Sequence, residues 1–160
     1  MDRQMSGPAY EDDVVRGVLA GAKTIAVVGA SPNPSRASHY VMAYLQSKGY
    51  RTIPVNPRAA GSEINGEEVY SRLADVPAPI DMVDVFRNSS AARDVVDEAI
   101  AEQKRLGIRS IWMQLGVRND AAARRAEAAG IAVVMDRCPK IEYPRLFGAV
   151  HRSAIAGVRS

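Results

Sequence analysis

Thr24-Ile25-Ala26-Val27-Val28-Gly29 is the stretch that decides the fold of this 160-residue chain, because it is almost wholly apolar and ends in glycine. A short apolar run of this kind is typical of a strand buried on both faces, as the strands of parallel sheets are. The loop that follows contains two prolines, and residues 38–48 then carry apolar side chains at helical spacing before Gly49. A glycine in that place commonly ends a helix. The stretch therefore predicts the first strand, loop and helix of a parallel α/β sheet.

The alternation of strand and helix continues along the chain. Further strands are predicted at 51–55, 81–86, 110–115 and 131–135, and helices at 10–21, 38–48, 91–106 and 120–129. Helices that alternate with strands are typical of βαβ units with right-handed crossovers. We therefore predict a Rossmann-like, three-layer α/β fold with a mostly parallel five-stranded sheet and helices on both faces. A single domain is expected over residues 1–160, with its core at about 23–146.

Other segments are less regular. Pro54 lacks a backbone N–H donor, so the strand that contains it is not expected at the centre of the sheet. Residues 62–68 are predicted to form a loop, and 69–73 a short helical piece. From Arg137 onward we expect irregular structure with weak helical character, and a frayed tail at 151–160.

The composition argues against several classes of partner. The net charge is +3, from 21 basic and 18 acidic residues mixed along the chain, so no basic face for a nucleic acid is expected. No stretch approaches the roughly 18–20 apolar residues that span a bilayer. Residues 1–13 do not resemble a signal peptide, and a single cysteine favours a cytoplasmic setting. One cysteine and two distant histidines predict no structural metal site.

The first strand–loop–helix unit is the best candidate for a binding site, because ligands of open parallel sheets bind beyond the carboxyl ends of the strands. Gly29 permits close backbone approach, Ser31 and Ser35 offer hydroxyl groups, and Arg36 offers a guanidinium suited to phosphate. The alternative is purely structural: Ser35 or Ser38 caps the helix, and Gly29 only turns the chain.

The loop lacks the fingerprints of two common nucleotide sites. Gly29 is followed by no second or third glycine at the spacing of a dinucleotide-binding loop, and Asn56 stands where an acidic residue would bind the NAD ribose. No lysine follows a glycine in the pattern of a P-loop. Both observations argue against NAD and against P-loop ATP hydrolysis.

Polar and aromatic residues also end the second and third strands. Pro57 offers a rigid apolar surface for a purine, Asn56 an amide and Arg58 a charge for a ribose phosphate, although the segment also fits an ordinary turn. Phe86 and Arg87 end the third strand, where an exposed ring would stack on adenine and a buried ring would belong to the core.

Cys138 follows the fifth strand and is flanked by Arg137 and Lys140, an arrangement found around reactive thiols. A nucleophilic thiol would need a base, and only the fold could bring His39 or His151 to it. A structural or ligand-lining cysteine is the other interpretation.

Five segments, in this order, resemble the stand-alone bacterial CoA-binding proteins, which are similar to the CoA-binding domain of succinyl-CoA synthetase. They are Val-Val-Gly-Ala-Ser with the following Pro-Asn-Pro-Ser-Arg (27–36), Val-Asn-Pro (55–57), Val-Asp-Val-Phe-Arg (83–87), Trp-Met-Gln-Leu-Gly (112–116) and Met-Asp-Arg-Cys-Pro-Lys-Ile-Glu (135–142).

The resemblance implies a Rossmann fold that binds coenzyme A. It assigns the phosphates to the first loop and the adenosine to the second, with Phe86 and Arg87 at the border of the nucleotide, and it matches Cys138 and Pro139 to a Cys-Pro pair of the synthetase domain. The first loop is represented by Gly29, Ala30, Ser31, Ser35 and Arg36, and the second by Asn56, Pro57 and Arg58.

The functional expectation is a small, non-catalytic binding or regulatory module for coenzyme A or an acyl-CoA. The synthetase regions that carry the phosphorylated histidine and grasp a nucleoside triphosphate have no counterpart in this sequence, so ligase activity is not expected. Two alternatives stay open: a CoA-dependent enzyme that uses Cys138, and an NAD(P)-binding redox domain. A homo-oligomer or a protein partner also stays open.

Overall fold

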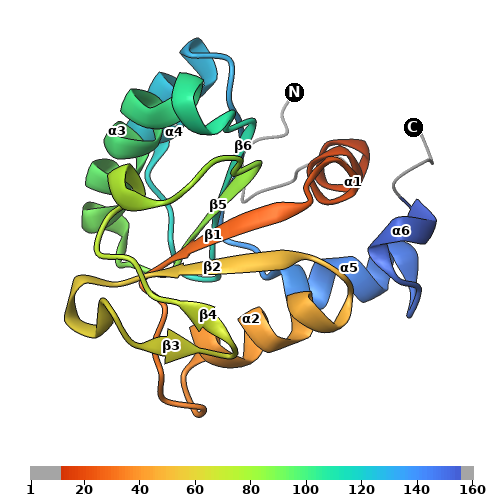
Figure 1. Cartoon of the computed structure of the whole chain (residues 1–160). Coiled ribbons are helices and arrows are strands. Elements are labelled where there is room, and N and C mark those ends of the chain that lie inside the picture. The colour runs from red at the N-terminus through yellow and green to blue at the C-terminus, as the bar shows by residue number, and fades with distance from the viewer. Residues whose placement is uncertain (1–11, 156–160) are drawn as a thin grey trace.

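The computed structural model describes residues 12–155, and a five-stranded parallel sheet forms its centre (Figure 1). Every neighbouring pair of strands in this sheet is parallel, which confirms the predicted fold class. In spatial order the strands are β2 (Arg51–Val55), β1 (Thr24–Val28), β5 (Met82–Val85), β6 (Ser110–Met113) and β7 (Ala132–Val134).

The remaining elements connect and cover these strands. The helices are α1 (Asp12–Gly21), α2 (Ala37–Ser47), α3 (Ser89–Leu106), α4 (Asp120–Ala128), α5 (Pro139–Phe147) and α6 (Arg152–Ile155). Two short 3-10 helices are η1 (Pro57–Ala59) and η2 (Leu73–Asp75), and β3 (Glu63–Ile64) pairs antiparallel with β4 (Glu67–Glu68).

Helices cover both faces of the sheet, as the sequence predicts. Val83 and Val85 of the central strand belong to one buried cluster together with residues of α3 and α4. Met82 belongs to the other, with residues of α1, α2 and α5. Because side chains alternate along a strand, β1, β5, β6 and β7 contribute to both clusters. We call the two sides the α3/α4 face and the α2/α5 face (Figure 1).

The strand that contains proline lies at an edge, as predicted. β2 is the terminal strand of the five-stranded sheet, and Pro54 lies opposite Val27 of β1 in the parallel register. On the outer side of β2, Val55 makes an isolated bridge to Tyr70, and the Tyr70 N–H donates to the Pro54 carbonyl oxygen at 3.0 Å.

The loop prediction for residues 62–68 is wrong. These residues form the β3–β4 hairpin, and Asn65 and Gly66 at its turn have positive φ angles of 51° and 84°. Asn-Gly between two extended segments is a strong hairpin signal, because both residues tolerate the left-handed conformation that a tight turn requires. The helical prediction for 69–73 is also wrong in place, since Tyr70 extends along β2 and the helical turn η2 begins at Leu73.

The chain after β7 is more ordered than its prolines suggest. Pro139 occupies the start of α5, where a missing N–H costs nothing, and α5 continues through Pro144 to Phe147. The predicted frayed tail is wrong for 152–155, because the Arg152 N–H donates to the Lys48 carbonyl oxygen at 2.8 Å and Ile155 is buried. Two parts of these predictions lie outside the described residues: residues 156–160 of the predicted tail, and Tyr10 and Glu11 of the first predicted helix.

Asp84 is a buried carboxyl group in the central strand. Its neighbours in register are Val27 and Trp112, and neither of its carboxylate oxygens has a hydrogen-bond partner within residues 12–155. Burial raises the pKa of Asp84 well above its usual range, because the sheet interior disfavours the ionised form. The folded protein therefore holds this carboxyl protonated under conditions in which an unfolded chain ionises it.

This difference predicts a pH dependence of stability. Since the folded pKa is raised, the folded state loses stability as pH rises above the unfolded value of about 3.9, up to the folded pKa. We expect the free energy of unfolding of the wild type to fall relative to Asp84→Asn by up to ~1.4 kcal/mol per pH unit. Urea denaturation from about pH 4 to about pH 7 measures it. Asp94→Asn, at an exposed position, is the control, and parallel curves for wild type and Asp84→Asn would contradict the assignment.

Candidate functional site

Gly29 brings the ends of three strands together. Its φ is +92°, and a Cβ at this position would collide with the main-chain oxygen of Phe86. The Gly29 N–H donates to the Val55 carbonyl oxygen at 2.9 Å, and the Phe86 N–H donates to the Val28 carbonyl oxygen at 2.8 Å. Glycine is therefore required here both by the backbone conformation and by the close approach of β5.

The loop between β1 and α2 is held by its own side chains. The Ser31 N–H donates to Ser38 Oγ at 3.0 Å, and the Asn33 N–H donates to Ser31 Oγ at 3.1 Å. Both the N–H and the hydroxyl of Ser35 donate to Asn33 Oδ1, at 3.0 and 2.9 Å. The Ser31 hydroxyl is only an acceptor in these contacts and could still donate to a ligand, whereas the Ser35 hydroxyl already donates within the loop.

Helix α2 begins without a side-chain cap. Arg36 is the N-cap residue and makes no capping hydrogen bond, so the alternative in which Ser35 or Ser38 caps the helix is wrong. Within the described chain, the N–H groups of Ala37 and Ser38 have no hydrogen-bond partner. Free N–H groups and the positive end of the helix dipole attract an anion, and the exposed guanidinium of Arg36 lies directly before them.

Asn56 joins the first loop to the second. Its Nδ2 donates to the Ala30 carbonyl oxygen at 2.7 Å, and its Oδ1 accepts from the Arg58 N–H at 2.9 Å. The amide thus orients the buried Ala30 peptide and starts the η1 turn. The structure gives Asn56 a positioning role that the sequence analysis did not foresee, and it leaves one Nδ2 proton for a ligand.

A cavity of about 480 Å³ opens at the carboxyl ends of β1, β2 and β5, on the α3/α4 face. Its size lies within the usual range for sites of small molecules and cofactors. It brings together six predicted residues: Gly29, Asn56, Pro57, Arg58, Phe86 and Arg87. The other residues around it are Val28, Val55, Ser71, Arg72, Asp94, Val95 and Glu98.

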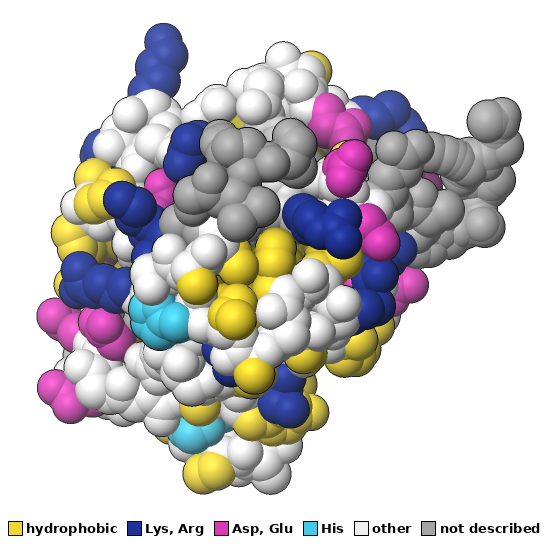
Figure 2. Space-filling model, turned by 90° about the vertical axis from the view of Figure 1, so that its right-hand side faces the viewer, with side chains coloured by type: hydrophobic (Ala, Val, Ile, Leu, Met, Phe, Trp, Pro, Cys, Tyr) yellow, Lys and Arg dark blue, Asp and Glu magenta, His cyan; other side chains and the backbone are white. Residues whose placement is uncertain are grey.

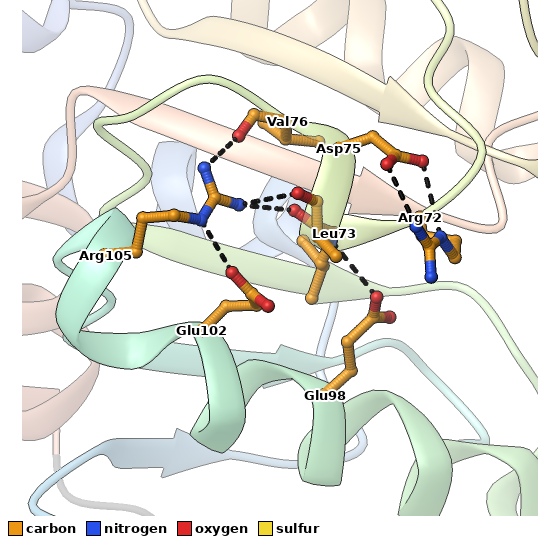
Figure 3. A network of polar contacts seen from close by, with 8 residues as sticks. Arg72, Leu73, Asp75, Val76, Glu98, Glu102 and Arg105 are labelled. Carbon is orange, nitrogen blue, oxygen red and sulfur yellow. Dashed lines mark hydrogen bonds and ion pairs between the residues drawn. The ribbon is translucent and has the colours of Figure 1, made fainter.

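Ser71 and Arg72, which line this cavity, belong to a segment that a network of polar contacts holds in place (Figure 3). Arg105 of α3 donates to three main-chain oxygens of the segment 73–76, at 2.8–3.1 Å, and pairs with Glu102 at 2.7 Å. Glu98 accepts from the N–H of the same segment at 3.2 Å, and Arg72 pairs with Asp75 at 3.2 Å. The segment that carries Ser71 and Arg72 is therefore clamped onto α3.

Some charged side chains around the cavity already have partners within the protein, and others do not. Arg72 and Glu98 take part in the network, and Asp94 forms an ion pair with the adjacent Arg93 at 3.5 Å. Within residues 12–155, the guanidinium groups of Arg58 and Arg87 form no hydrogen bond or ion pair, and both are exposed. A guanidinium in this state can bind a phosphate through two parallel hydrogen bonds.

Phe86 and the Cys-Pro pair lie differently from the rest. Phe86 is half-buried and packs against the cluster of the α2/α5 face, although it also borders the cavity. Cys138 and Pro139 are buried at the start of α5, outside the cavity lining. Neither described histidine hydrogen-bonds to Cys138, and His151 bonds instead to Ser153 at 2.9 Å. The described residues contain no cluster of metal-ligating side chains.

Sequence reasoning missed the contribution of α3 and of the segment before η2. Asp94, Val95 and Glu98 follow the helical i, i+1, i+4 pattern that puts side chains on one face, which was an available signal. Ser71 and Arg72 reach the cavity only through the fold of the β3–β4 hairpin and the Arg105 network.

A second cavity of about 340 Å³ lies near the opposite ends of the strands, between α1 and the start of β6 and β7. Its lining includes the apolar residues Val14, Val18 and Ala22, and none of the predicted site residues belongs to it. Figure 2 shows the side of the molecule that carries α1 and α6, where hydrophobic side chains gather at the surface. No helix of the described chain is long and apolar enough to span a membrane.

Comparison with known proteins identifies the family of this chain. The sequence model of the CoA binding domain matches residues 23–144, which include the first loop, the cavity and the Cys-Pro pair. The chain belongs to this CoA-binding domain family. Its match ends within α5 and leaves out α1 and α6.

Relatives in the family include small proteins and parts of large ones. The uncharacterized protein YneT of Bacillus subtilis (strain 168) is 36% identical over 129 residues, which are 81% of this chain and 91% of YneT. A solved structure from Thermus thermophilus is 46% identical with a TM-score of 0.78, and the match covers 86% of this chain and all of that one. The alpha subunit of ADP-forming acetate–CoA ligase I of Pyrococcus furiosus is 31% identical over 84 residues, half of this chain but 18% of the subunit.

The collision at Gly29 predicts a loss of stability on substitution. Gly29→Ala places a methyl group against the Phe86 oxygen, which must move, and forces a non-glycine residue into positive φ. We expect the free energy of unfolding to fall by roughly 1–3 kcal/mol. Gly61→Ala is the matched control, because Gly61 has a similar φ of +89° but open space around it. Equal losses in the two variants, measured by urea denaturation, would show that the contact with Phe86 costs nothing.

Proposed function

We propose that this protein binds coenzyme A or an acyl-CoA as a small, non-catalytic binding or regulatory module. The observation that carries the proposal is the cavity at the carboxyl ends of β1, β2 and β5, lined by two arginines whose guanidinium groups have no partner within residues 12–155. The loop that leaves the cavity at Gly29 leads to the uncapped start of α2. Membership of the CoA-binding domain family supports the choice of ligand.

The positions of the positive charges suggest where each chemical group of the ligand binds. The first loop, with Arg36 and the free N–H groups at the start of α2, suits the pyrophosphate. Arg58 and Arg87 suit the 3′-phosphate of the ribose, and the cavity that they line suits the adenosine. This placement accounts for a site with more free positive charge than an NAD site would need.

Two features favour coenzyme A over NAD. A carboxylate that ends the second strand would bind an NAD ribose, and Asn56 stands there with its amide bonded to Ala30 and to the Arg58 N–H. Arg58 follows at the place where a ribose phosphate needs a cation. An unphosphorylated ribose would leave that arginine without a partner.

A binding role also fits the surroundings of Cys138 better than nucleophilic catalysis does. The thiol is buried, and neither described histidine lies within hydrogen-bond reach of it. An activated nucleophile needs a base that contacts it. We therefore give Cys138 a structural or ligand-lining role.

Calorimetric titration of the purified protein with coenzyme A, and with NAD and ATP at the same salt concentration, tests the proposal. We expect saturable binding of coenzyme A and much weaker binding of the two controls, because neither NAD nor ATP carries the 3′-phosphate that coenzyme A has on its adenosine ribose. Equal binding of all three, or no binding of coenzyme A, would contradict the proposal and leave the fold unaffected.

The unpaired arginines predict a second result. Arg58→Ala removes a charge-assisted contact to a phosphate, so we expect the affinity for coenzyme A to fall roughly 10- to 100-fold. The affinity of the variant should also depend less on salt, because one screened charge pair is gone. Arg36→Ala should behave similarly. Arg124→Ala is the control, because Arg124 is an exposed arginine of α4. Unchanged affinity and salt dependence would remove Arg58 from the site.

A further inference from the structure

Three exposed hydrophobic side chains belong to segments that begin at the carboxyl edge of the sheet. Tyr40 is 47% exposed in the first turn of α2, Ile141 is 51% exposed in the first turn of α5, and Leu115 is 54% exposed two residues after the end of β6. We call these three residues the apolar rim. Because α2 and α5 follow parallel strands, their first turns lie at the same edge as the cavity.

Tyr40 lies on the side of α2 that faces α5. Tyr44, one turn further along, contacts Tyr143 of α5 edge to face with ring centroids 6.1 Å apart. The Lys140 Nζ lies 5.7 Å from the Tyr44 ring. Residues four apart occupy one face of a helix, so Tyr40 projects beyond Tyr44 toward the start of α5.

Gln114 is a buried acceptor without a donor at the same edge. It is 6% exposed, and its Oε1 has no hydrogen-bond partner within residues 12–155. β6 ends at Met113, and its side chains alternate between the two faces, with Trp112 on the α2/α5 face. We infer from this alternation that Gln114, one residue beyond the strand, lies on the side of Trp112. The Trp112 Nε1 donates to the Arg137 carbonyl oxygen at 2.8 Å, so this face lies beneath the segment that carries Cys138.

An unpaired buried amide oxygen is costly, and a ligand with an N–H group would satisfy it. Two strand spacings of ~4.8 Å separate β1 from β6, so Gln114 lies roughly 10 Å across the sheet from the loop between β1 and α2. The thiol-terminated arm of coenzyme A carries amide groups between apolar segments and is long enough to cross that distance. Its acyl end would then meet the apolar rim.

We propose that the carboxyl edge on the α2/α5 face binds the acyl-bearing arm of an acyl-CoA. Gln114 Oε1 accepts a hydrogen bond from an amide N–H of the arm, and Tyr40, Ile141 and Leu115 contact the acyl group beside the buried Cys138. This inference rests on the proposed function. It adds that the ligand carries a hydrophobic acyl group, and that the protein prefers it to free coenzyme A.

Three probes test the inference by calorimetry: adenosine 3′-phosphate 5′-diphosphate as the nucleotide half, coenzyme A, and hexanoyl-CoA. In the wild type, we expect affinity to rise in that order. Gln114→Leu should weaken coenzyme A roughly fivefold to tenfold and leave the nucleotide half unchanged, because only the arm loses its acceptor. Ile141→Ser should reduce the advantage of hexanoyl-CoA over coenzyme A roughly fivefold, because it removes apolar contact with the acyl group.

Matched controls are Gln46→Leu, at a half-buried glutamine of α2, and Val150→Ser, at an exposed hydrophobic position after α5. Binding of the nucleotide half also reports whether each variant is folded. If Gln114→Leu does not fold, Ile141→Ser still tests the inference, because it changes only an exposed side chain. If neither the nucleotide half nor coenzyme A binds the wild type, the proposed function fails. If both bind, but Gln114→Leu and Ile141→Ser leave the affinity ratios unchanged, the arm site is wrong and the proposed function stands.

Discussion

The carboxyl ends of β1, β2 and β5 are bound together where Gly29 passes the main-chain oxygen of Phe86, and the arrangement of the site depends on this contact. No side chain fits between the two strands at that point. The loop that follows can therefore leave the sheet at once and deliver the uncapped start of α2 to the same edge. A bulkier residue would separate β1 from β5 and, with them, the walls of the cavity.

The parts of the site that the sequence predicts are those that follow directly from strand ends. Gly29, Arg58 and Arg87 could be placed because each comes within three residues of the end of an apolar strand, and parallel strands end at one edge. Arg105 could not be placed, because its three contacts are to main-chain oxygens about thirty residues earlier, which no side-chain pattern reveals. The β3–β4 hairpin was missed for a different reason: its Asn-Gly turn was visible, but its strands are only two residues long.

Residues expected to serve a ligand also serve the protein. The Asn56 amide and the Ser35 hydroxyl are engaged in hydrogen bonds that hold the two loops. Much of the site is therefore preorganised before any ligand arrives, which lowers the entropy that binding must overcome. Within residues 12–155, the Arg58 and Arg87 guanidinium groups and Gln114 Oε1 remain without partners, so under the proposed function they are the groups to which a ligand would hydrogen-bond.

Pro54 also bears on how the molecule meets its neighbours in a crowded solution. An exposed sheet edge is a template on which another chain can add a strand, and long flat edges lead to aggregation. On the outer side of β2, Pro54 offers no N–H to a further strand. The backbone of Tyr70 already pairs with Val55 and donates to the Pro54 carbonyl oxygen. The opposite edge, β7, is three residues long. Neither border of the sheet offers the long unpaired run on which intermolecular strand addition depends, so the architecture itself guards against fibrous assembly.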